Sequence, residues 1–171
     1  MHCDPCIPGD WRPEERATLV YLVRGDLVLL IRKLRGHGAG KINAPGGRIE
    51  AGESVETCAI REVDEEVGIR VQSLDLRALL RYHDPAERFT MAGFAFISSD
   101  FLGNPSRTWE ADPFWCRIDE IPYDEMWEND RIWLPRVLKG ERIRADFRFC
   151  RDRLVAHTVI PDENIRQELA D

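Results

Sequence analysis

The sequence contains no apolar run long enough to cross a bilayer, because its longest strongly hydrophobic segment, Leu27 to Ile31, has only the length of a β-strand. Cysteine is scarce as well, and an odd, scattered set of five does not form a disulfide framework. The first 15 residues hold acidic residues and prolines but no hydrophobic stretch, so they do not resemble a secretory signal. We therefore expect a soluble intracellular protein of the cytoplasm, without a membrane partner.

Basic residues are also fewer than acidic residues. The chain has 24 Lys and Arg residues against 31 Asp and Glu residues, which gives a formal net charge of −7. This balance disfavours a broad electrostatic grip on a nucleic-acid backbone, so we do not expect a polymeric nucleic acid as partner. An acidic protein can still bind small phosphate compounds if metal ions bridge the like charges.

The length of 171 residues and the ordinary mixture of hydrophobic and charged residues fit one globular domain. We expect an N-terminal arm over residues 1–15, a single domain over 16–160 and a C-terminal tail over 161–171 that frays at its end. The arm contains Cys3 and Cys6 in a C-x-x-C spacing. No second such pair or pair of histidines accompanies them, so a solvated arm is a better interpretation than a zinc or redox site.

Hydrophobic patterning predicts mostly strands, with one strong helix early in the chain and another late. A hairpin is expected around Gly25-Asp26, followed by a glycine-rich loop over 33–47. The predicted strands cover 16–24, 27–32, 70–82, 88–98, 114–118 and 142–149, with one more inside 152–171, and the predicted helices cover 54–67 and 131–139. This mixture predicts the α+β class, with a mixed sheet or sandwich and helices packed outside it.

The first predicted helix has clear signals at both ends. Ser54 can cap its start, and Gly68 stands where a C-terminal glycine belongs. At about 100° per residue, Ile60, Val63 and Val67 form an apolar stripe.

Three carboxylates, Glu62, Glu65 and Glu66, fall together on a different face of this helix. Neighbouring like charges destabilise a helix, and a hard divalent cation such as Mg²⁺ or Mn²⁺ would offset their repulsion. Arg61 can pair with Glu65 one turn later, and the Gly46-Gly47 corner lets backbone carbonyls approach the same ions. Such a cluster suits hydrolysis of a phosphate ester or anhydride, although an isolated E-x-x-E-E is more often a solvated helix face.

Residues 47–69, GRIEAGESVETCAIREVDEEVGI, carry a much longer pattern: Gly-x5-Glu-x7-Arg-Glu-aliphatic-x-Glu-Glu-x-Gly-aliphatic. In this pattern the chain resembles the Nudix hydrolases without a departure. The resemblance implies an α/β/α sandwich with a mixed β-sheet and a catalytic loop-helix-loop that binds metal. It also implies hydrolysis of a nucleoside diphosphate linked to another group.

The same resemblance implies roles for the residues of the pattern. Glu62 and Glu66 would be the main metal ligands, assisted by the carbonyl of Gly46. Glu65 would be a ligand or a base, and Arg61 would orient it. The remaining glutamate of the pattern, Glu53, would be structural or outer-sphere.

Beyond residues 47–69, the chain looks like the MutT-type branch of the family, which removes oxidised purine nucleoside triphosphates. The matching segments are 35–47, 109–127 and 130–135. By this resemblance Asn43 would hydrogen-bond the purine, Trp127 would stack on it and Asp130 would face its N–H and carbonyl edge. Glu110 would be a further metal ligand or the general base. The other candidates for substrate contact are Lys33 at the phosphates and Thr18, Tyr82 and Met91 in the pocket.

Two positions depart from that branch. Asn129 precedes Asp130 where the branch has two adjacent aspartates. Two carboxylates can share a proton and change their donor and acceptor pattern, whereas an amide donates and accepts at any pH. Base selectivity therefore need not follow the branch. His37 stands where an aromatic hydrocarbon side chain is expected, and an exposed loop histidine is its simplest interpretation.

We therefore expect magnesium-dependent hydrolysis of a purine nucleoside triphosphate to a nucleoside monophosphate and pyrophosphate. In this hypothesis, two or three metal ions bind the triphosphate, and Glu66 or Glu110 activates a water. Two alternatives stay open. One is hydrolysis of a dinucleotide polyphosphate, a nucleotide sugar or capped RNA, and the other is a catalytically idle sensor that binds nucleotides. The sequence does not determine the preferred base, the sugar or the oligomeric state.

Overall fold

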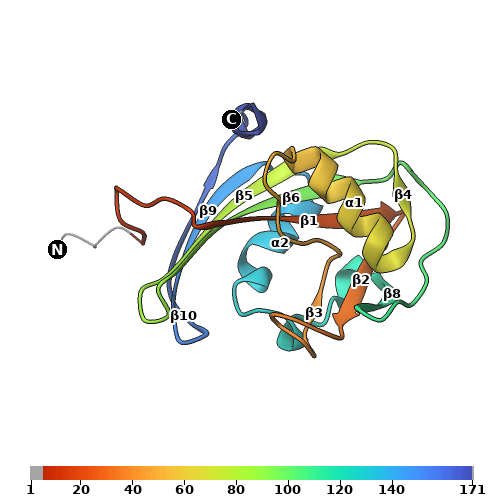
Figure 1. Ribbon diagram of the computed structural model, residues 1–171, viewed down its shortest axis with the longest axis horizontal. Coiled ribbons are helices and arrows are strands. Elements are labelled where there is room, and N and C mark those ends of the chain that lie inside the picture. Colours follow the sequence, from red (N-terminus) through yellow and green to blue (C-terminus); the bar gives the residue numbers. More distant parts are fainter. Residues whose placement is uncertain (1–5, 171) are drawn as a thin grey trace.

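The computed structural model describes residues 6–170, which form a mixed β-sheet with helices on both faces (Figure 1). The elements are β1 (Glu15–Arg24), β2 (Leu27–Lys33), β3 (Ile42–Asn43), α1 (Val55–Val67), β4 (Arg70–Val71), β5 (Asp75–Asp84), β6 (Phe89–Ser98), β7 (Phe101–Leu102), β8 (Ala111–Arg117), α2 (Asp130–Leu138), β9 (Ile143–Cys150) and β10 (Arg153–Pro161). The main sheet has the order β10-β9-β5-β6-β1-β2-β3, and β8 also pairs with β2. Strands β1 and β6 run parallel, as do β5 and β9, so the predicted mixed sheet is confirmed.

The predicted hairpin of β1 and β2 exists but opens quickly. Only two residue pairs next to the turn, Val23 with Val28 and Arg24 with Leu27, join the strands. Beyond them the loop after β3 takes the place of β2 beside β1. The amides of Val20 and Thr18 donate to the carbonyls of Pro45 and Gly47, each at 2.8 Å. This divergence inserts the glycine corner into the middle of the sheet.

Alternation along β1 supplies a hydrophobic core on each face of the sheet. Val20 and Leu22 belong to a core that α1 covers, while Tyr21 belongs to a second core with Trp133 of α2. Figure 1 shows the two helices at different faces of the curved sheet, as the predicted α/β/α sandwich requires. None of the helices in residues 6–170 is both long and apolar enough to cross a membrane.

Helix α1 begins and ends where its sequence signals predict. The Ser54 hydroxyl accepts a hydrogen bond from the Thr57 amide at 3.1 Å, and Gly68 ends the helix with a φ of 74°. The predicted apolar stripe is partly wrong, because Ile60 is 39% exposed. The helix instead buries Val55, Ala59, Val63 and Val67, which repeat every four residues, and small Ala59 lets the helix approach the sheet.

Three segments differ from the predicted elements. The strand predicted over 70–82 is divided into β4 and β5, because residues 72 and 73 turn away to donate their amides to the Asp100 carbonyl. The glycine-rich loop contains the short strand β3, and the loop after β6 contains β7, which pairs with β4. Helix α2 contains Pro135, in agreement with the prediction of a helix around a proline.

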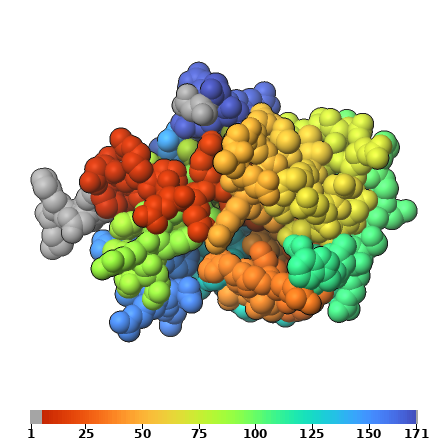
Figure 2. Space-filling model, in the orientation of Figure 1, coloured from red at the N-terminus to blue at the C-terminus, as the bar shows by residue number. Residues whose placement is uncertain are grey.

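Both chain ends are more ordered than expected within the described residues. Residues 6–14 of the predicted arm pack on the sheet: Ile7 is buried, and the Trp11 indole N–H donates to the Tyr82 carbonyl at 3.2 Å. Figure 2 shows this red segment lying against the rest of the molecule. At the other end a short helical turn, Ile165–Leu169, buries Ile165, so the predicted frayed end is wrong up to residue 170. Cys3, half of the C-x-x-C spacing, lies outside the described residues.

Candidate active site

The Gly46-Gly47 corner lies directly against the carboxylates of α1. The Gly46 amide donates to Glu66 Oε2 at 3.2 Å. A Cβ on Gly46 would collide with the Thr18 carbonyl, and a Cβ on Gly47 would collide with the carboxylate of Glu62. The absence of a side chain at these two positions therefore lets the backbone of the corner lie directly against the carboxylates of α1.

Arg61 organises the acidic residues around it. Its guanidinium donates to Glu53 at 2.7 and 2.9 Å, to Glu62 at 2.8 Å and to Glu65 at 3.2 Å. The predicted pair with Glu65 therefore exists, but the bonds to Glu53 are shorter. The hydrogen bonds from Arg61 and from the Glu50 amide lower the pKa of Glu53 to about 2, so Glu53 stays ionised.

The remaining carboxylates differ sharply in their exposure. Glu66 is only 3% exposed, and burial raises its pKa to about 7, although the Gly46 amide and Lys33 oppose that shift. Burial also raises the pKa of Glu62, although the hydrogen bond from Arg61 opposes it. The side chain of Glu65 is 57% exposed. Exposure to solvent therefore varies across the predicted carboxylate face, from buried Glu66 to Glu65 at the surface.

Glu110 approaches the same group from a loop far away in sequence. Its charge contributes to the raised pKa of both Glu62 and Glu66. The loop is attached to the end of α1, because the Thr108 hydroxyl donates to the Glu66 carbonyl at 2.8 Å. The Glu110 carbonyl in turn accepts a hydrogen bond from the Leu34 amide at 2.8 Å.

The donor atoms fit a hard divalent cation. They are the carboxylate oxygens of Glu62, Glu66 and Glu110, whose charges repel one another, and a cation would relieve that repulsion. Within residues 6–170, however, no three Asp, Glu, His or Cys side chains converge closely enough to form a ready ligand set. Glu62 is turned toward Arg61, so a bound cation would compete with that ion pair for its oxygens.

A cavity of about 590 Å³ runs from Glu66 to a group of aromatic and amide side chains. At one end it is lined by Glu66 with the two glycines, and at the other by the residues that the sequence assigned to the substrate. Its lining includes all eight of those residues: Thr18, Lys33, Asn43, Tyr82, Met91, Trp127, Asn129 and Asp130. Of the predicted catalytic and metal-binding residues, Arg61, Glu62, Glu65 and Glu110 do not line it.

The far end of the cavity is polar and buried. Asn129 and Asp130 are 1% and 3% exposed. The Asp130 carboxylate accepts hydrogen bonds from the Trp133 indole at 3.1 Å and from the Trp127 amide at 3.2 Å, yet burial raises its pKa to about 7. The Asn129 side-chain nitrogen donates to the Tyr82 hydroxyl at 3.2 Å.

Two further polar residues of the cavity are already engaged within the protein. The side-chain oxygen of Asn43 accepts a hydrogen bond from the Ala44 amide at 2.9 Å, which leaves its NH₂ group to donate elsewhere. The hydroxyl of Thr18 lies 3.5 Å from the sulfur of Cys58, on the side of α1. Thr18 therefore contributes to the wall of the cavity, with its hydroxyl turned to the helix.

One wall of the cavity is aromatic. The ring of His37 stacks on Trp127 with centroids 5.1 Å apart, and Phe89 follows at 6.3 Å from His37. His37 is exposed, as predicted for a loop histidine, but the sequence did not indicate this stack. Lys41 lies 4.8 Å from the centre of the Trp127 ring. Phe89 was missed, although its position two residues before Met91 on β6 places both on one face of the strand.

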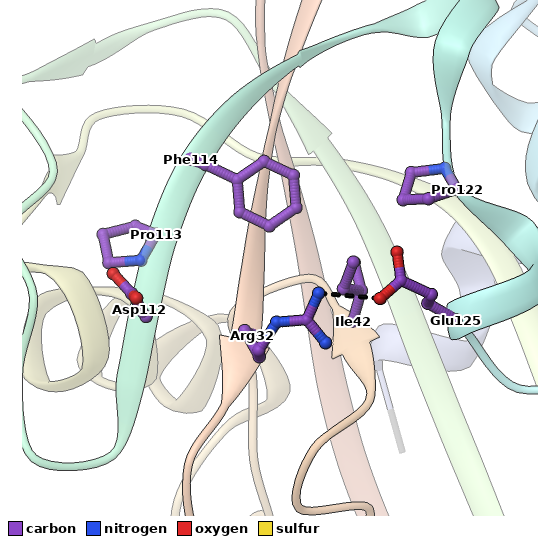
Figure 3. A pocket seen from close by; sticks show the side chains of 7 residues that line it. All are labelled: Arg32, Ile42, Asp112, Pro113, Phe114, Pro122 and Glu125. Carbon is purple, nitrogen blue, oxygen red and sulfur yellow. Dashed lines mark hydrogen bonds and ion pairs between the residues drawn. The ribbon is translucent and has the colours of Figure 1, made fainter.

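A second, smaller pocket of about 310 Å³ lies against strands β2 and β8 (Figure 3). Its two charged walls, Arg32 and Glu125, pair with each other at 2.8 Å across it, as the dashed line shows. Asp112, also at its rim, is paired with Arg107. Its charged groups thus already have partners, whereas the larger cavity adjoins the carboxylates.

Comparison with known proteins agrees with this geometry. The family model described as the NUDIX domain matches residues 13–137. A protein of Danio rerio named oxidized purine nucleoside triphosphate hydrolase is 36% identical over 149 residues, which cover 86% of this chain and 96% of that protein. A protein of the same name from Mus musculus is 33% identical over 77% of this chain and 85% of its own length.

The fold has a close structural counterpart. The crystal structure of a MutT protein from Bacillus halodurans superimposes with a TM-score of 0.75 at 27% identity, covering 85% of this chain and 97% of that one. The predicted fold class is therefore confirmed.

Proposed function

The chain belongs to the Nudix hydrolase family, and we propose that it cleaves oxidised purine nucleoside triphosphates into a nucleoside monophosphate and pyrophosphate with the help of Mg²⁺ or Mn²⁺. The observation that carries this proposal is the single cavity that joins Glu66 to the pair Asn129 and Asp130. One nucleotide could thus place its phosphates near the carboxylates of α1 and its base against the polar end.

In this proposal the metal ions are held by Glu62, Glu66, Glu110 and the carbonyl of Gly46. When bound, they neutralise phosphate charge and make an attacking water more acidic. The raised pKa of Glu66 supports this assignment, because a buried carboxylate is stabilised as the ion by a nearby cation. Glu66 or Glu110 would accept the proton of the water. Exposed Glu65 would be a further ligand or base, and Arg61 would orient it.

The side chains of the cavity would bind and orient the substrate. Lys33 lies close enough to lower the pKa of Glu66, so its charge would also attract the triphosphate. Trp127 would stack on the base, while Asn43 would donate from its free NH₂ group. Holding the phosphate chain and the base in fixed positions would supply much of the rate acceleration.

The choice of oxidised purines is supported by the relatives from Danio rerio and Mus musculus, which match over most of their lengths and carry that activity in their names. A base pocket with two polar side chains suits discrimination between purines, because a buried hydrogen-bonding group left unpaired by the wrong base is costly.

A panel of substrates tests the proposal. Purified protein with Mg²⁺ would be incubated with oxidised and ordinary purine triphosphates, a dinucleotide polyphosphate, a nucleotide sugar and NAD-capped RNA, and the products would be separated by chromatography. We expect monophosphate and pyrophosphate in equal amounts from the oxidised triphosphates. Faster cleavage of another substrate class would reject this substrate assignment. Nucleotide binding without any cleavage would indicate the idle sensor instead.

A further inference from the structure

We propose that the Tyr82 hydroxyl is a specificity-determining group, because it fixes the Asn129 amide with its oxygen toward the cavity and so favours guanine-type over adenine-type bases. This inference rests on the proposed function, since it concerns how the same cavity distinguishes its substrates. It assigns to Tyr82 a role beyond that of lining the pocket.

The geometry of the pair defines which atom of the amide faces the substrate. The Asn129 nitrogen donates to the Tyr82 hydroxyl at 3.2 Å, and both residues line the cavity. Among the described residues, no side chain or backbone group donates to the Asn129 side-chain oxygen. Burial raises the pKa of the Tyr82 phenol, so the hydroxyl is neutral and available as a partner at every physiological pH.

Tyr82 is itself held firmly through both its ring and its backbone. On the cavity side its ring packs against Phe147 and Phe149, with centroids 5.7 and 6.3 Å away. Its backbone carbonyl accepts the hydrogen bond from Trp11, in a segment that precedes the family's domain match at residue 13. A hydroxyl fixed in this way keeps its partner amide in place, and because the Asn129 nitrogen occupies the hydroxyl, the oxygen is the atom that faces the cavity.

An amide held in this orientation offers an acceptor beside Asp130. A guanine-type base carries two neighbouring N–H donors, the ring N1–H and the exocyclic amino group, on the edge that such a pocket reads. An adenine-type base carries a ring nitrogen acceptor beside its amino group. Against the Asn129 oxygen that acceptor would stay unpaired, and an amide cannot take up a proton to correct the mismatch.

Binding of two monophosphates that differ only in this edge tests the inference without metal or turnover. The affinities of 8-oxo-dGMP and 8-oxo-dAMP would be measured by calorimetry on the full-length chain, on Tyr82→Phe and on Tyr123→Phe. Tyr123 is a matched control, because the charge of Asp130 contributes to its raised pKa as it does for Tyr82, but the hydrogen bond of the Asn129 amide goes to Tyr82. We expect the native chain to prefer 8-oxo-dGMP and Tyr82→Phe to lose about tenfold of that preference, while Tyr123→Phe keeps it.

A second pair of variants separates orientation from simple loss of a contact. In Asn129→Asp the two oxygens of the side chain are equivalent, so adding Tyr82→Phe should change the ratio of affinities by less than about twofold. The inference is overturned if Tyr82→Phe leaves the native ratio unchanged, if the native chain prefers 8-oxo-dAMP, or if the two substitutions act additively. Absence of triphosphate cleavage would reject the proposed function alone, because these binding ratios do not depend on it.

Discussion

The Arg61 guanidinium donates to both carboxylate oxygens of Glu53, at 2.7 and 2.9 Å, and thereby attaches helix α1 to the loop that precedes it. The same guanidinium holds Glu62 at 2.8 Å. The position of a proposed metal ligand therefore depends on an ion pair formed with a residue eight positions earlier. Arg61 thus acts as a positioning residue, since its contacts are with carboxylates of the protein.

Replacing Arg61 with lysine should lower kcat about 10- to 100-fold, because an ammonium group cannot bond Glu53 and Glu62 in the same fixed fork. The KM for nucleotide should change little, since Arg61 does not line the cavity. Steady-state kinetics would measure both constants. Arg131→Lys is the control, because within residues 6–170 the ion pair of Arg131 is with exposed Asp124. Unchanged kcat in Arg61→Lys would contradict a positioning role for Arg61.

Substituting Gly47 with alanine should remove most activity, because the new Cβ would collide with the carboxylate of Glu62. Stability should fall much less than activity, because the clash is with the end of the flexible Glu62 side chain, which can shift. Activity assays and thermal melting would report the two effects. Gly9→Ala provides the comparison, since nothing lies within 4 Å of a Cβ there. Native activity in Gly47→Ala would mean that Glu62 can move away without consequence.

Magnesium should raise the melting temperature of the native chain and have little effect on Glu62→Gln. A ligand that binds only the folded state at about a hundredfold excess over its Kd stabilises it by about 2.7 kcal/mol. Thermal melting with and without Mg²⁺ measures this difference. Asp64→Asn on the exposed side of the same helix should respond as the native chain does. An equal rise in Glu62→Gln would remove Glu62 from the set of metal ligands.

The pH dependence of the unfolding free energy should reveal the raised pKa of Asp130. Its pKa is raised from 3.8 to about 7 by burial, so the folded state holds this proton more tightly than the unfolded state. The contribution of Asp130 to stability is therefore greatest below about pH 4 and is lost as the pH rises to about 7. Unfolding free energies of the native chain and Asp130→Asn between about pH 5 and about pH 8 should diverge accordingly. Parallel curves would show that Asp130 ionises normally.

The parts of the molecule that could be predicted from the sequence are those with local signals. Ser54 and Gly68 define the ends of α1 through contacts within a few residues, and the pattern over 47–69 places the carboxylates beside the glycine corner. The prediction of the apolar stripe was right for Val63 and Val67 but wrong for Ile60, because helical periodicity alone does not say which neighbouring residues the sheet accommodates. Ala59 occupies the contact instead.

The remaining features depend on contacts between distant segments. Thr108 reaches the Glu66 carbonyl across 42 positions and brings Glu110 near the helix. The bond between Asn129 and Tyr82 spans 47 positions, and Trp11 reaches Tyr82 across 71. No periodicity or spacing encodes such distances, because they arise from the order of strands in the sheet.

The proposed activity is tested most directly by comparing kcat/KM for 8-oxo-dGTP and dGTP with the native chain and Mg²⁺. We expect a preference of at least about tenfold for the oxidised substrate, with monophosphate and pyrophosphate as the products. Equal or slower cleavage of 8-oxo-dGTP, or release of single phosphates in place of pyrophosphate, would contradict it.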